Sequence, residues 1–113
     1  MDMINKEYIN VEDALNRIGG NEGLYKKLLG RFVDGNYLEG LSNAIESGDL
    51  EEAGKAAHTL KGVSANLSLV KVQTLSTEVE HAIKQDQEYK EKLDELKQAY
   101  AATLEIIADI TKP

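Results

Sequence analysis

The 113-residue sequence contains no cysteine and no tryptophan, and its one proline is the last residue, Pro113. Without cysteine the chain has neither disulfide bonds nor thiolate metal ligands, which suits a reducing compartment. Without an internal proline, nothing in the sequence interrupts a helix from within. Aromatic residues make up only 5% of the chain, so a core must be mainly aliphatic.

The sequence also lacks the marks of membrane, secreted and nucleic-acid-binding proteins. No apolar run approaches the ~20 residues that span a bilayer, and residues 1–6 do not begin a signal peptide. The net charge is −7, whereas nucleic-acid binding draws on clustered Lys and Arg. We therefore expect one cytoplasmic domain over residues 1–113 that binds neither nucleic acid nor membrane. The initial Met and the lack of a linker favour a free-standing protein.

Apolar residues recur at helical spacing through most of the chain, and no segment alternates for long enough to form a strand. After a short arm over residues 1–9, helices are predicted over residues 11–18, 22–47, 49–67, 69–85 and 87–110. Their predicted N-caps are the polar residues Asn10, Asn21, Asp49, Ser68 and Asp86. The linkers are short, which favours antiparallel neighbours. The sequence predicts an all-α fold, an antiparallel up-down-up-down four-helix bundle with a short accessory N-terminal helix.

The long second helix changes its apolar face across Asp34-Gly35-Asn36. Either the helix kinks there, or its two halves are separate and pack on different partners. Because this tripeptide is shorter than most helix connections, we favour one long, kinked helix.

The predicted helix over residues 49–67 carries the candidate site. Wound as an α-helix, it places one apolar stripe on the core side: Ala53, Ala57, Leu60, Ser64 and Leu67. His58 points roughly 140° away from the centre of that stripe. Its neighbours on the helix surface are Gly54, Gly62 and Ala65, with Lys55 and Lys61 alongside.

The two glycines beside His58 bear on function. Each glycine inside a helix costs about 1 kcal/mol relative to alanine. Two of them beside one histidine indicate that close approach of another molecule matters there more than helix stability. A solvated surface histidine is the alternative interpretation of His58.

Several other chemistries lack their residues. There is no Gly-x-Ser-x-Gly elbow, too few histidines for a triad, and no phosphate-binding glycine loop, so we predict neither hydrolase activity nor ATP binding. Glu78 and His81 form Glu-x-x-His, half of a di-iron bundle motif, but the second half is missing and a solvated His81 is favoured. Neutral imidazole, however, accepts phosphoryl groups. His58, its small neighbours and Lys61 provide the exposed nitrogen, the room and the cation that this chemistry needs.

The segment Ala57-His58-Thr59-Leu60-Lys61-Gly62-Val63-Ser64-Ala65-Asn66-Leu67 resembles the signature of histidine-containing phosphotransfer (HPt) domains. That signature runs roughly Ala-His-x-Leu-Lys-Gly-x-Ser/Ala-x-x-Leu-Gly. Ile18-Gly19-Gly20-Asn21 and Gly48-Asp49 are also similar to segments of that family. One departure is Ser68, which stands where the family usually has Gly and puts the turn after the His58 helix in question.

The resemblance implies a role for each matching residue. His58 resembles the phospho-accepting nucleophile, Lys61 the lysine that steadies the phosphoryl oxygens, and Gly62 the glycine that makes room for the partner. Glu80 falls where the family often has Gln or Glu reaching the imidazole, which would fix its tautomer; a solvated carboxylate is the alternative. On helix geometry, Gly54, Lys55 and Ala65 join Gly62 as expected partner-binding residues.

The implied function is that of a phosphorelay intermediate in two-component signalling. It accepts a phosphoryl group on His58 from a receiver-domain aspartyl-phosphate and passes it to another receiver. The expected partners are response-regulator receiver domains or a hybrid sensor kinase, and the protein is expected to be a monomer without autokinase activity. No cofactor or metal is expected on this chain, because the receiver brings the Mg²⁺. The alternative is a non-catalytic helical adaptor that binds a partner through the flat face around His58.

Overall fold

The computed structural model describes residues 3–112, and within them the chain forms seven helices and no strand. The helices are α1 (Met3–Tyr8), α2 (Val11–Arg17), α3 (Glu22–Asp34), α4 (Tyr37–Glu46), α5 (Leu50–Asn66), α6 (Val70–Lys84) and α7 (Lys90–Thr111). The predicted all-α class is confirmed. Across residues 3–112, no helix has both the length and the apolar character needed to traverse a bilayer.

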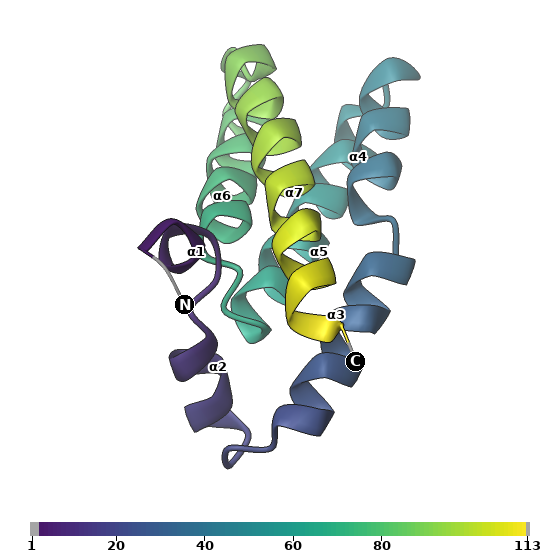
Figure 1. The fold of residues 1–113 in the computed structure, drawn as a ribbon. Coiled ribbons are helices and arrows are strands. Elements are labelled where there is room, and N and C mark those ends of the chain that lie inside the picture. Colours follow the sequence, from purple (N-terminus) through teal and green to yellow (C-terminus); the bar gives the residue numbers. More distant parts are fainter. Residues whose placement is uncertain (1–2, 113) are drawn as a thin grey trace.

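The longer helices lie side by side around a common core (Figure 1). α5 packs against α4 and α6, while α7 packs against α6 and α3. The short α1 lies against α6 and α7, and α2 meets α3. Fully buried core side chains include Leu29, Leu41, Leu60, Leu96 and Ile107. As expected from the composition, the core is mainly aliphatic, so helix packing rather than aromatic stacking positions α5 and α6.

The single kinked helix predicted over residues 22–47 is wrong, because α3 and α4 are separate helices. Asn36 has a φ of 49°, the left-handed conformation that Asn adopts more readily than most residues. Gly35 before it has no Cβ, and a Cβ there would collide with the ring of Tyr37. α3 packs on α7 whereas α4 packs on α5. The change of apolar face therefore marks two helices with different partners.

The arm predicted over residues 1–9 is also wrong where the structure describes it, since residues 3–8 form α1; residues 1–2 lie outside the described part. Ile9 is fully buried, and the Asn10 N–H donates to the carbonyl of Ser68 at 2.9 Å. A six-residue helix has almost no intrinsic stability. Its packing on α6 and α7, which the local sequence pattern does not reveal, is what holds it.

Three of the predicted N-caps are confirmed. The side chains of Asn10, Asn21 and Asp49 each accept a hydrogen bond from the N–H three residues further on. Ser68 and Asp86 are not N-caps, and α6 and α7 begin further along the chain. Both residues have a φ of 56°, so each ends the preceding helix in the left-handed conformation that glycine usually takes there.

Candidate functional site

The site lies between α5 and α6 and is centred on His58. The whole stripe predicted to face the core from α5 is buried: Ala53, Ala57, Leu60, Ser64 and Leu67. This fixes the rotation of α5 and turns His58 outward, with 64% of its side chain exposed. Glu80 reaches it from α6, and the Glu80 side chain is only 6% exposed. An exposed imidazole therefore rests on a buried carboxylate.

A hydrogen bond joins the two side chains. Nδ1 of His58 lies 2.8 Å from Oε2 of Glu80. An ionised carboxylate only accepts hydrogen bonds, so Nδ1 carries the ring proton. In the neutral imidazole the other nitrogen, Nε2, is then unprotonated and has a lone pair for nucleophilic attack. The contact expected from the family resemblance is present, and the solvated alternative for Glu80 is excluded.

Two lysines complete the surroundings of Glu80. Nζ of Lys61 lies 2.8 Å from Oε1, and Nζ of Lys84 lies 2.7 Å from Oε2. Burial alone would raise the pKa of Glu80, but the hydrogen bonds from Lys61, Lys84 and His58 outweigh it and lower this pKa to about 2. Glu80 is thus ionised at neutral pH, and the site holds a fixed negative charge beneath the imidazole.

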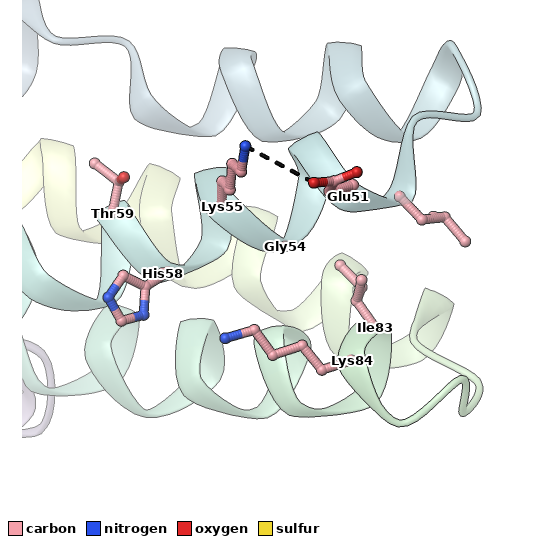
Figure 2. A pocket seen from close by; sticks show the side chains of 8 residues that line it. Glu51, Gly54, Lys55, His58, Thr59, Ile83 and Lys84 are labelled. Carbon is pink, nitrogen blue, oxygen red and sulfur yellow. Dashed lines mark ion pairs between the residues drawn. The ribbon is translucent and has the colours of Figure 1, made fainter.

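Lys84 was not predicted to be a site residue, and it supplies a second ammonium group next to Glu80. The role of Lys55 in partner binding stays a prediction. Lys55 is exposed and its ammonium lies 4.0 Å from Glu51 on its own helix. Figure 2 shows Lys55 turned toward Glu51, while the ammonium of Lys84 points toward the imidazole. A usable signal existed, because Glu80 and Lys84 stand four residues apart, the spacing of ion pairs along a helix. It required knowing that Glu80 lies beside His58.

His58 borders two hollows. The larger has a volume of 650 Å³ and is lined by Leu50, Glu51, Gly54, Lys55, His58, Thr59, Ile83 and Lys84 (Figure 2). A smaller one of 270 Å³ is lined by His58, Lys61, Thr77, Glu80, His81, Lys84 and Gln85. His81 is exposed at its edge. Room for an added group therefore exists next to His58, bordered by Lys61 and Lys84.

The small residues around His58 differ in accessibility. Gly62 is exposed, and a Cβ there would meet nothing within 4 Å. Ala65 is half-buried, and its carbonyl accepts a hydrogen bond of 2.6 Å from Arg17. Gly54 is buried, and a Cβ there would lie 3.8 Å from Ile83 of α6. The expectation that Gly54 lies on an open face is therefore wrong, because α6 covers it.

Comparison with known proteins identifies the family and the fold of the chain. A family model described as Hpt domain matches residues 34–106, which include His58, Lys61, Gly62 and Glu80. The fold is similar to the crystal structure of the HPT domain from the Hpt sensor hybrid histidine kinase from Shewanella, with a TM-score of 0.71 and 21% sequence identity. That match covers 95% of this chain and 99% of the other. No curated protein sequence matches the chain. Since the family match spans more than half of the chain, the protein belongs to the Hpt domain family, the phosphotransfer carriers of two-component signalling.

Proposed function

We propose that His58 takes a phosphoryl group from an aspartyl-phosphate on a receiver domain and passes it to a second receiver. The observation that carries this proposal is the hydrogen bond from Nδ1 of His58 to the buried Glu80, at 2.8 Å. This hydrogen bond keeps the proton on Nδ1, so Nε2 of the exposed ring is the nucleophile. The ammonium groups of Lys61 and Lys84 lie nearby, each paired with Glu80.

In the proposed step, the lone pair of Nε2 attacks the phosphorus atom of the aspartyl-phosphate. An N–P bond forms as the P–O bond to the aspartate breaks, and the bonding electrons leave with the aspartate carboxylate. The proton stays on Nδ1, so the ring becomes positively charged while it carries the phosphoryl group. The ionised Glu80 stabilises that charge from its fixed position. The second receiver reverses these bond changes on its own aspartate.

The neighbouring residues support this assignment. Lys61 supplies positive charge near the phosphoryl oxygens, and the open surface at Gly62 lets a receiver approach closely. In this proposal the receiver binds the Mg²⁺, the chain itself uses no cofactor, and it has no autokinase activity. We also propose that it acts as a monomer of one domain, residues 1–113, with α3–α4, α5, α6 and α7 as the four columns of an antiparallel up-down-up-down bundle.

Phosphotransfer from radiolabelled receivers of the same organism tests the proposal. We expect an acid-labile, base-stable phosphate on the wild type and on the control variant His81→Gln, and none on His58→Gln. Because His58 is largely exposed, His58→Gln should change stability by less than about 0.5 kcal/mol and leave the helical circular dichroism unchanged. Label at the wild-type level on His58→Gln would place the site elsewhere. A receiver that binds the wild type without transferring label would favour the adaptor alternative.

A further inference from the structure

Glu80 has more cationic partners than it needs. Its Oε1 pairs with Lys61, while its Oε2 takes hydrogen bonds from both Lys84 and Nδ1 of His58. If the Lys84 ammonium moves away, each oxygen of Glu80 still has one hydrogen-bond donor. If the Lys61 ammonium moves away, Oε1 has none. The Lys84 side chain is also the more exposed, at 58% against 33% for Lys61. Of the two cations, Lys84 is the one free to move.

The charges of the site point the same way. Before phosphorylation two ammonium groups face one carboxylate, and with the imidazole in the neutral form that attacks phosphorus, one positive charge is in excess. Transfer adds a phosphoryl group with two negative charges and makes the ring positive, so it adds one net negative charge. With both lysines present, the phosphorylated site is neutral. With Lys84 absent it would carry an uncompensated negative charge, next to oxygens that need donors.

We propose that Lys84 is a second phosphoryl-binding residue, whose ammonium exchanges Oε2 of Glu80 for a phosphoryl oxygen when His58 is phosphorylated. The inference rests on the proposed function, since it needs His58 to be the acceptor. Lys84 lines both hollows beside the imidazole, and Figure 2 shows its ammonium already directed toward the ring. The Lys84 side chain is exposed and flexible enough for its ammonium to change partner by rotation about its own bonds.

The test compares four proteins: the wild type, Lys84→Gln, Lys84→Arg, and Lys71→Gln as the control. Lys71 is an exposed lysine on the same helix as Lys84, and the hollow that it lines does not include His58. Phosphoramidate serves as a small phosphodonor, so no receiver contact enters the measurement. We expect Lys84→Gln to be phosphorylated roughly five- to tenfold more slowly than the wild type, Lys71→Gln to stay within twofold, and Lys84→Arg to recover most of the rate.

Nuclear magnetic resonance of the lysine ammonium groups and of the His58 ring gives a readout independent of rate. On phosphorylation, the ammonium signal of Lys84 should shift while that of Lys71 should not. In unphosphorylated Lys84→Gln the Nδ1–H signal of His58 should persist, because Lys61 still holds Glu80. Loss of that signal would make Lys84 only a support for Glu80 and overturn the proposal, as would an unchanged rate or an unmoved Lys84 ammonium. Failure of the proposed function would look different, since a phosphorylated receiver would then transfer no label to His58 of the wild type.

Discussion

At the scale of single residues, Glu80 links the chemistry of the site to the stability of the fold. Its side chain is buried, and three donors from α5 and α6 converge on it. The family resemblance suggested that Glu80 reaches the imidazole, but not that two lysines share it. The resemblance assigns Lys61 to the phosphoryl oxygens alone, whereas in the structure Lys61 also pairs with the carboxylate that contacts His58.

The lowered pKa of Glu80 predicts how this contribution depends on pH. A carboxylate whose pKa falls from 4.5 to about 2 on folding stabilises the protein above pH 5 and loses that effect as the pH falls through 4.5 toward 2. Glu80→Gln should therefore lower the free energy of unfolding by roughly 2 kcal/mol at pH 7. By pH 2 the difference from the wild type should nearly vanish. Urea denaturation across this pH range measures the gap.

Glu78→Gln is the control for that experiment, because Glu78 lies on the same helix, is 43% exposed and only approaches Lys92 at 3.9 Å. Its free energy of unfolding should stay within about 0.5 kcal/mol of the wild type at every pH. A constant gap between Glu80→Gln and the wild type from pH 7 to pH 2 would show that the charge of Glu80 is not what stabilises the fold.

At the scale of elements, α5 combines a buried stripe with an open surface at Gly62. Gly62→Leu should stabilise the helix by about 1 kcal/mol, because leucine is a better helix former and a Cβ at this position meets nothing within 4 Å. Transfer from a receiver should nevertheless fall sharply, since the new side chain obstructs its approach. The reaction with phosphoramidate should change far less. Thermal melting and the two transfer rates test these expectations.

Gly62→Ala is the matched variant, because it also raises helix propensity but adds only a methyl group. It should melt at or above the wild-type temperature and keep most of its receiver-dependent transfer. If Gly62→Leu exchanges phosphate with a receiver at the full rate, the small residue beside His58 has no part in docking.

The turn between α5 and α6 depends on Ser68, the residue that departs from the family pattern. Its left-handed φ of 56° is strained for serine, while its hydroxyl donates to Asp13 at 2.7 Å and accepts from Arg17 at 3.1 Å. The hydrogen bonds from Ser68 and Arg17 also lower the pKa of Asp13. Ser68 thus adopts the left-handed backbone conformation that a glycine would adopt here. Its hydroxyl also links α2 to the C-terminal end of α5 by hydrogen bonds.

Two substitutions separate the backbone strain from the hydrogen bonds. Ser68→Gly and Ser68→Ala both remove the hydroxyl, but only glycine relieves the left-handed strain. Ser68→Gly should therefore be more stable than Ser68→Ala by about 1 kcal/mol, as measured by urea denaturation. Equal stability of the two variants would mean that residue 68 is not held in the left-handed region.

At the scale of the whole molecule, the site is a local exception to the acidic character of the chain. The net charge is −7, yet at His58 two ammonium groups face one carboxylate. Lys61 lies on α5 and Lys84 on α6, so this local excess of positive charge depends on how the two helices pack against each other. Residues of α2 and α3 hold the C-terminal end of α5 by hydrogen bonds. Arg17 donates to the carbonyl of Ala65, and Tyr25 donates to the carbonyl of Leu67.

The sequence by itself determined the all-α class, the position of α5 and α6 and the outward rotation of His58. These follow from helical periodicity, from caps such as Asp49 and from the absence of internal proline, all of which act over a few residues of chain. Only the tertiary structure decided the break at Asn36 and the docking of α1. It also decided the burial of Gly54 under Ile83 and the placement of Lys84 rather than Lys55 beside the imidazole. Each of these depends on which helix packs against which, and contacts between segments distant in sequence leave no local pattern to read.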